Sequence, residues 1–161
     1  MNQKEKIEKI KEFRLIDDVF FEVFASDIPA CQEILRTILE DEKLIVNDVI
    51  VQSSERNIYG RSVRLDALCT LGDGSLCNIE IQRSDNDNHL KRARFNAASI
   101  TVKESEPGIN FENVKDVYIV YISEKDFFKA GLTTYHIDKI IRENGITVED
   151  GLHEIFVNAV F

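Results

Sequence analysis

Two carboxylates and one amide stand in a pair of otherwise apolar segments near the middle of the chain. Asp66 lies in residues 63–71, Glu80 and Gln82 lie in residues 76–82, and a Gly-Asp-Gly sequence at residues 72–74 separates the two segments. Carboxylate oxygens are preferred ligands of Mg²⁺, which commonly uses one or two of them together with water and phosphate. If the fold brings Asp66 and Glu80 together, the pair is suited to bind such a cation, and the two segments form a candidate active site.

The spacing of the apolar residues predicts a β-hairpin that carries them on one face. Both segments alternate, and their apolar positions are odd-numbered: Val63, Leu65, Ala67, Cys69, Leu71, Cys77, Ile79 and Ile81. A three-residue loop at residues 72–74 keeps odd residues opposite odd residues, because a slip by one residue would invert a whole strand. The resulting pairs are Cys69 with Cys77, Ala67 with Ile79, Asp66 with Glu80, and Arg64 with Gln82.

In this register Asp66 and Glu80 oppose each other on the polar face. Opposed Cβ atoms in an antiparallel pair lie ~5 Å apart, and like charges at that distance are destabilising. A divalent cation bound between the two carboxylates would offset their repulsion. We therefore expect Mg²⁺, or Mn²⁺ as its substitute, to bind here.

Composition limits the class of protein. With 161 residues, 43% of them hydrophobic and 30% charged, the chain is expected to form a single domain over residues 1–161. A net charge of −9 argues against binding nucleic acid through bulk charge, although local basic residues can still do so. The charged N-terminus lacks the apolar segment of a secretion signal, and no apolar run is long enough to span a membrane, so we expect a cytoplasmic protein without a membrane partner. Cys31, Cys69 and Cys77 have no metal-type spacing and are expected to be thiols.

Hydrophobic periodicity predicts both helices and strands. Helices are expected over residues 3–13, from Pro29 to about residue 40, and over residues 133–143. A further helix is expected to begin at Asp17-Asp18, with an apolar face formed by Val19, Phe20, Val23 and Phe24. Another is expected to begin at His89, with Leu90, Ala93, Ala97 and Ile100 on one face. Strands are expected over residues 44–53, in the hairpin, over residues 117–122 and over residues 153–161, with a turn at residues 57–61. This order predicts an α/β fold with a mixed central sheet flanked by helices, and residues 1–14 as an N-terminal helical extension. Because the chain stops directly after an apolar strand, we expect a C-terminal portion to be missing.

Four phrases in this order resemble the PD-(D/E)XK family transposases, a group within the PD-(D/E)XK nuclease superfamily that is related to recombination-promoting nucleases. They are Arg-Leu-Ile-Asp-Asp-Val-Phe at residues 14–20, Gly-Arg-Ser-Val-Arg-Leu-Asp at residues 60–66, Asn-Ile-Glu-Ile-Gln-Arg at residues 78–83 and Lys-Arg-Ala-Arg-Phe-Asn at residues 91–96. The likeness extends over about residues 13–160. It implies a restriction-endonuclease-like αβββαβ core and an endonuclease, associated with mobile elements or recombination, that hydrolyses phosphodiester bonds in DNA with Mg²⁺ and without an organic cofactor.

The resemblance also implies a role for each polar residue of the hairpin. Asp66 and Glu80 correspond to metal ligands, and the backbone carbonyl of Ile81 corresponds to a third ligand. Gln82 stands where the superfamily more usually has lysine. Because an amide cannot take up a proton as an amine can, we expect Gln82 to orient the attacking water by hydrogen bonds. Phe95 stands where relatives often carry tyrosine and supplies no hydroxyl.

Several other residues have two interpretations. Lys91, Arg92 and Arg94 are candidates for contacts with DNA phosphates, and they could equally form a basic, solvated helix face. Arg64 could hold the scissile phosphate, and it could equally neutralise Glu80. Asp18 could supply a further acid near the metal, and it could instead cap a helix.

Two other classes of function stay open. Gln82 and the acidic net charge also fit a catalytically weak or inactive remnant that binds DNA or a protein. A purely structural or regulatory interaction domain would bind neither Mg²⁺ nor DNA. The sequence leaves open whether RNA is a substrate and whether the chain forms a homodimer.

Overall fold

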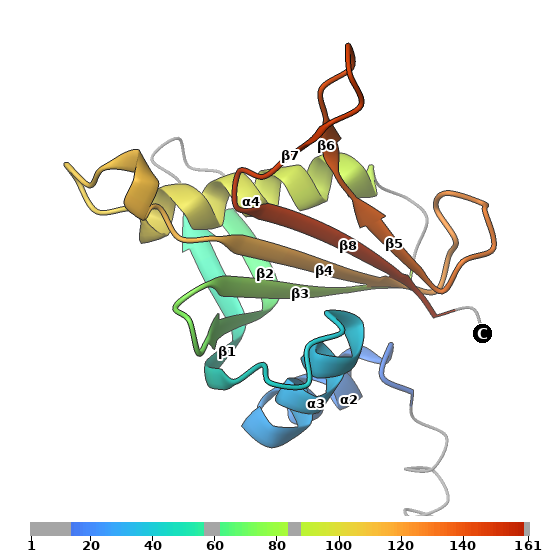
Figure 1. Cartoon of the computed structure of the whole chain (residues 1–161). Coiled ribbons are helices and arrows are strands. Elements are labelled where there is room, and N and C mark those ends of the chain that lie inside the picture. Colours follow the sequence, from blue (N-terminus) through green and yellow to red (C-terminus); the bar gives the residue numbers. More distant parts are fainter. Residues whose placement is uncertain (1–13, 57–61, 84–87, 160–161) are drawn as a thin grey trace, which may run out of the picture.

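A computed structural model describes residues 14–56, 62–83 and 88–159 of the chain (Figure 1). The helix expected over residues 3–13 and the turn expected at residues 57–61 lie outside this part. The helical elements are α2 (Asp18–Ala25), α3 (Ile28–Ile38), α4 (His89–Glu104) and the short 3-10 helix η1 (Phe111–Asn113). The strands are β1 (Val46–Arg56), β2 (Ser62–Leu71), β3 (Leu76–Gln82), β4 (Val117–Ser123), β5 (Thr134–Ile137), β6 (Lys139–Ile140), β7 (Thr147–Val148) and β8 (Leu152–Asn158).

A six-stranded mixed sheet forms the middle layer, in the order β1-β2-β3-β4-β8-β5. Strands β1, β2 and β3 pair antiparallel, β3 pairs parallel with β4 after the α4 crossover, and β4 pairs parallel with β8. Helix α4 covers one face of the sheet, and α2 and α3 cover part of the other face (Figure 1). The predicted α/β class with a mixed, helix-flanked sheet is confirmed, and the arrangement is consistent with a restriction-endonuclease-like fold.

The hairpin between β2 and β3 has the predicted register. Cys69 pairs with Cys77 and Ala67 pairs with Ile79. The Leu71 N–H donates to the Ser75 carbonyl at 2.9 Å, which closes the three-residue loop. Gly74 in this loop has φ +89, a left-handed conformation that glycine adopts without steric cost. Loop length and alternation together therefore fixed the register.

Two hydrophobic clusters pack on opposite faces of the sheet. Leu65 was expected to share a face with Ala67, but the two residues lie in different clusters. Ala67 packs on the side of α2 and α3, whereas Leu65 packs with Leu68 on the side of α4. The alternation breaks between Leu65 and Ala67, where Gln52 of the neighbouring strand takes φ +55. A left-handed residue that is not glycine is uncommon in a strand and interrupts its regular pleat.

Helix α2 buries a different face from the predicted one. Val19 and Val23 are 70% and 67% exposed, while Phe21 and Ala25 are buried in the core. Asp17 occupies the N-cap position without capping, because one of its carboxylate oxygens accepts the Arg14 N–H at 2.8 Å. The predicted apolar face was therefore wrong, since hydrophobic residues surround most of this short helix and tertiary contacts select which of them are buried.

The helix predicted over residues 133–143 is also wrong. This stretch forms β5, which pairs antiparallel with β8, and then β6, which pairs with β7 in a hairpin that projects from the sheet (Figure 1). The turn of that hairpin contains Asn144 and Gly145, and Gly145 has φ +74. Threonine, tyrosine and isoleucine in the first part favour a strand, and Asn-Gly is a strong signal for a hairpin turn.

Helix α4 begins as predicted, with Asn88 as its cap, since the Asn88 side chain accepts the Lys91 N–H at 3.0 Å. Its buried residues include Ala93, Ala97 and Ile100, as expected, but Leu90 is 50% exposed. No helix in the described residues combines the length and the hydrophobicity needed to cross a membrane.

The face that α2 buries gives a first testable prediction. Phe21→Ala should lower the free energy of unfolding by about 3–5 kcal/mol, because it opens a cavity in the core. Val19→Ala should change the free energy of unfolding by less than about 0.5 kcal/mol, because the side chain is exposed. Urea unfolding of the two variants measures the difference, and a larger loss for Val19→Ala than for Phe21→Ala would mean that α2 buries the other face.

Candidate active site

Asp66 and Glu80 meet where the regular pairing of β2 and β3 ends. The regular pairing of these strands extends to Ala67 and Ile79 and ends before residues 66 and 80. From there the Glu80 Oε1 accepts the Asp66 N–H at 3.2 Å, and the Asp66 Oδ2 accepts the Ile81 N–H at 2.9 Å. Each carboxylate thus binds a backbone N–H of the opposite strand, and the charge of Asp66 acts on Glu80. Asp66 lines a cavity beside α2, whereas Glu80 contacts Arg92 of α4, so the prediction that both lie on one polar face of the hairpin is not confirmed.

A buried amide positions the Glu80 carboxylate. The Asn78 side chain is fully buried, and its Nδ2 donates to the Glu80 Oε1 at 3.0 Å and to the Ala67 carbonyl at 3.0 Å. Asn96 of α4 is also buried, and its Nδ2 donates to the Asn78 Oδ1 at 3.3 Å. Sequence reasoning missed both asparagines. The available signal was an asparagine at position 96 on the otherwise apolar face of α4.

Arg92 of α4 reaches the same carboxylate. One guanidinium nitrogen lies 3.1 Å from the Glu80 Oε2, and the other donates to the Gln82 Oε1 at 3.2 Å. Such an ion pair gains strength in a buried site, because a low dielectric screens it weakly. The structure therefore joins Glu80, Gln82 and Arg92 in one cluster, with the arginine as the local positive charge.

Burial dominates the electrostatics of Glu80. The residue is 1% exposed, and its pKa is raised from 4.5 to about 7, first by the loss of solvation and second by the negative charge of Asp66. The hydrogen bond from Asn78 and the charge of Arg92 lower the pKa without cancelling that rise. The site is thus short of positive charge around Glu80, which suits it to receive a cation.

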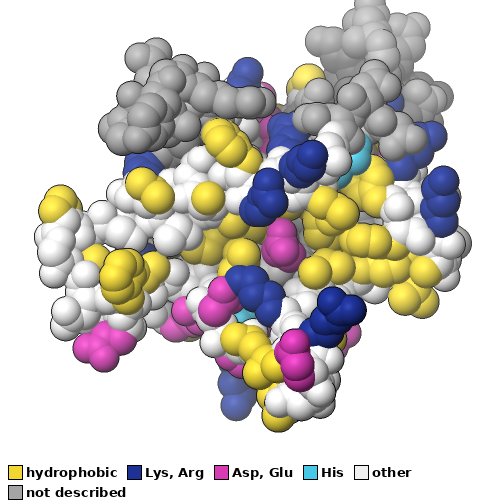
Figure 2. Space-filling model, turned by 90° about the horizontal axis from the view of Figure 1, so that it is seen from above, with side chains coloured by type: hydrophobic (Ala, Val, Ile, Leu, Met, Phe, Trp, Pro, Cys, Tyr) yellow, Lys and Arg dark blue, Asp and Glu magenta, His cyan; other side chains and the backbone are white. Residues whose placement is uncertain are grey.

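The other predicted basic residues do not join this cluster. Arg64 donates to the Gln52 Oε1 on β1, and its predicted register position opposite Gln82 stays a prediction. Lys91 and Arg94 are exposed on α4. Seen from the α4 side, the basic side chains of the described residues lie among acidic and apolar ones (Figure 2).

Helix α2 brings an acid close to Asp66. Asp18 begins the helix, and its side chain lies outside the described part of the structure. Glu22, one turn further on, lines a cavity of about 40 Å³ together with Asp66 and Gln52. The Glu22 Oε2 accepts a hydrogen bond from the Gln52 Nε2 at 2.9 Å. Sequence reasoning missed Glu22, although residues four apart on a helix share a face and Glu22 stands four residues after Asp18.

Ion pairs hold α2 against the ends of the central strands. The Arg83 guanidinium lies 3.1 Å from Asp17 and 3.7 Å from Glu124, and Arg14 also pairs with Glu124. Arg83 follows Gln82 directly, and Glu124 follows β4. These contacts link the start of α2 to the carboxyl ends of β3 and β4, next to the candidate site.

The donor set fits a hard divalent cation. Asp66, Glu80 and Gln82 supply oxygen atoms, which Mg²⁺ and Mn²⁺ prefer over nitrogen and sulfur. Within the described ranges no group of three or more His, Cys, Asp and Glu side chains is arranged to hold a metal ion. A cation here would therefore need backbone, amide or water oxygens besides the two carboxylates, and Mg²⁺ commonly keeps several waters.

Comparison with known proteins gives one match. A family model described as PD-(D/E)XK nuclease family transposase matches residues 14–159. No curated protein and no solved structure matches the chain. The match includes every residue of the Asp66, Glu80, Gln82 and Arg92 cluster.

The raised pKa of Glu80 predicts how stability depends on pH in metal-free protein. Between pH 4.5 and about 7 the folded state holds a proton on Glu80 that the unfolded state has released. The stability due to this proton is fully present below pH 4.5 and is lost as the pH rises through about 7. The Glu80→Gln side chain cannot ionise, so this variant should not lose that stability. The free energy of unfolding of Glu80→Gln minus that of the wild type should therefore rise by about 1–3 kcal/mol between pH 5 and pH 8.

Denaturant unfolding with a metal chelator at a series of pH values measures this change. Glu106→Gln, which removes an exposed carboxylate, serves as the matched control and should follow the wild type. A constant difference between Glu80→Gln and the wild type across this range would contradict the raised pKa.

Proposed function

Because the chain belongs to the PD-(D/E)XK nuclease family transposases, we propose that it is a metal-dependent endonuclease that hydrolyses phosphodiester bonds in DNA at the cluster of Asp66, Glu80 and Gln82. The family ties a nuclease-like function to mobile elements. The observation that carries the proposal is the reciprocal contact of the two carboxylates, in which Glu80 binds the backbone of Asp66 and Asp66 binds the backbone of Ile81.

In this proposal Asp66 and Glu80 hold Mg²⁺, with Mn²⁺ as a substitute, and the backbone carbonyl of Ile81 is the third ligand. A divalent cation bound between them supplies charge that polarises a phosphate oxygen and lowers the pKa of water. The chain's own contribution is to keep the carboxylates fixed before the substrate arrives. Asn78, itself held by Asn96, provides that rigidity for Glu80.

Gln82 and Arg92 act on the reacting groups. The oxygen of the attacking water forms a bond to phosphorus, the bond from phosphorus to the leaving oxygen breaks, and the leaving oxygen gains a proton. Gln82 orients the water through its amide and takes up no proton, so the water's proton passes to solvent. Arg92 already lies between Glu80 and Gln82, where its guanidinium can stabilise negative charge that develops on the phosphate.

Basic residues outside the cluster of Asp66, Glu80 and Gln82 are proposed to add further contacts with DNA. Arg64, Lys91 and Arg94 are proposed to bind backbone phosphates, which would add affinity that falls with salt concentration. Glu22 replaces Asp18 as the better-supported accessory acid, because it lines the small cavity beside Asp66. We further propose that residues 1–161 act as one nuclease domain.

One observation favours a second candidate function. Arg92 already offsets part of the charge of Glu80, and it occupies one of the carboxylate oxygens that a cation would need. If the ion pair between Arg92 and Glu80 stays formed and no cation binds, the protein would bind DNA or a protein partner without cutting DNA. This is the catalytically inactive alternative, and it predicts the same fold with a different result in the assay below.

Nicking of supercoiled plasmid with Mg²⁺ or Mn²⁺ tests the proposal. Asp66→Asn should lower the nicking rate by about 100-fold or more, because it removes one charge from the proposed cation site and keeps an oxygen that can accept the Ile81 N–H. Glu106→Gln should nick at the wild-type rate. Nicking by Asp66→Asn at the wild-type rate would reject the site, and DNA binding by the wild type without any nicking would favour the inactive alternative.

A further inference from the structure

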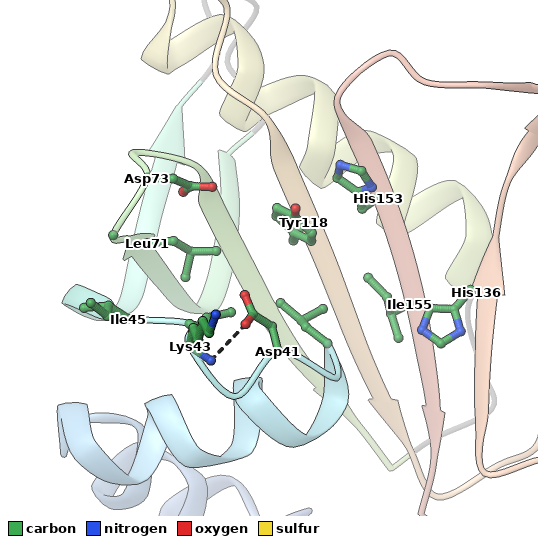
Figure 3. A pocket seen from close by; sticks show the side chains of 12 residues that line it. Asp41, Lys43, Ile45, Leu71, Asp73, Tyr118, His136, His153 and Ile155 are labelled. Atoms are coloured by element: carbon green, nitrogen blue, oxygen red, sulfur yellow. Dashed lines mark hydrogen bonds between the residues drawn. The ribbon is translucent and has the colours of Figure 1, made fainter.

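A second cavity lies at the opposite end of β3 from the nuclease site. It measures about 450 Å³ and opens between the loop after α3, the turn of the β2–β3 hairpin, and strands β4, β8 and β5 (Figure 3). Strand β3 has 7 residues and runs from this turn to Gln82, so the two sites are roughly 20 Å apart. Side chains that line the cavity project from the face of the sheet that α3 packs on, whereas Asn78 and Glu80 contact α4.

The lining combines an apolar floor with one aromatic wall. The floor is aliphatic: Leu39, Leu44, Ile45, Leu71 and Ile155. Tyr118 and His153 form the wall, with ring centroids 4.3 Å apart and ring planes inclined by 17°. Because the two rings stack face to face, each leaves only its outer face to a planar group. An aliphatic floor beside such a pair suits a ligand that has an apolar stem and a planar end.

Two carboxylates at the rim have unused hydrogen-bonding capacity. The Asp41 Oδ1 accepts the Lys43 N–H at 2.9 Å, and the Asp73 Oδ1 accepts the Ser75 N–H at 2.9 Å. Among the described residues, the second oxygen of neither carboxylate has a hydrogen bond or an ion pair. Each is therefore fixed in orientation by its loop and has one oxygen directed to other partners.

The surroundings of the cavity carry a negative field. Burial raises the pKa of the Tyr118 hydroxyl, and so do, in decreasing order, the charges of Asp73, Asp116 and Asp41. Lys43 is the single lysine or arginine among the described residues that line the cavity. Anions such as phosphates are therefore disfavoured, and a cation with several N–H donors is favoured.

We propose that this cavity binds the guanidinium group of an arginine side chain presented by a protein or peptide partner. The aliphatic stem of the arginine would lie on the apolar floor, and its planar end would stack on the outer face of the Tyr118 ring and donate to Asp41 and Asp73. A lysine offers a compact charge without the planar fork, so arginine is preferred over lysine. This site is independent of the proposed nuclease function, because it shares no residue with it.

Titration of ¹⁵N-labelled protein with N-acetyl-arginine amide, followed by amide chemical shifts, tests the proposal. Shifts should concentrate on the lining loops, at Lys43, Gly72 and Asp73. The isosteric but uncharged N-acetyl-citrulline amide should bind more weakly. Asp73→Asn keeps the oxygen that accepts the Ser75 N–H and removes the charge, so it should weaken arginine binding about fivefold.

Glu112→Gln removes an exposed carboxylate outside the cavity and is the matched control, with affinity equal to that of the wild type. The proposal is overturned if the arginine probe causes no shifts at the lining loops, if citrulline binds as tightly as arginine, or if Asp73→Asn binds as tightly as the wild type. Tighter binding of guanosine than of arginine would also overturn it, since a neutral planar ring would then be the better occupant.

Discussion

The candidate active site depends on two carboxylates that replace backbone carbonyls at the point where two strands separate. Asp66 and Glu80 each accept an N–H from the strand that carries the other. This exchange satisfies backbone donors that the end of the ladder would leave without partners, and buried N–H groups without partners are costly. It also places two negative charges together, so the protein must either compensate that charge or protonate one of the groups.

Both forms of compensation are present. Arg92 brings a guanidinium to Glu80, and the pKa of Glu80 is raised to about 7, so part of the charge is removed near neutral pH. Asn78 and Asn96 hold the carboxylate in one orientation whichever form it takes. Across the sheet, Gln52 keeps a left-handed backbone beside Asp66. Strained or charged groups of this kind lower stability and persist where the arrangement serves a function.

The local sequence pattern predicted the register of the β2–β3 hairpin, whereas the buried face of α2 and the partner of Arg92 depend on tertiary contacts. The pairing of Cys69 with Cys77 followed from alternation and a three-residue loop, and both are properties of the local sequence. The buried face of α2 was not predictable in the same way, because Val19 and Phe21 are equally apolar and the choice between them depends on the packing of α3 and β1. Arg92 looked like any surface arginine of a basic helix, since nothing in the sequence reports that it reaches Glu80 across the α4–β3 contact.

Mn²⁺ binding tests most directly whether Asp66 and Glu80 together hold a divalent cation. Free Mn²⁺ can be followed by electron paramagnetic resonance while metal-free protein is added at pH 8, where Glu80 is mostly ionised. We expect the wild type to bind Mn²⁺ and the Asp66→Asn/Glu80→Gln double variant to lose that binding while keeping its fold by circular dichroism. Equal Mn²⁺ binding by the two proteins would contradict the claim, and so would the absence of Mn²⁺ binding by the wild type.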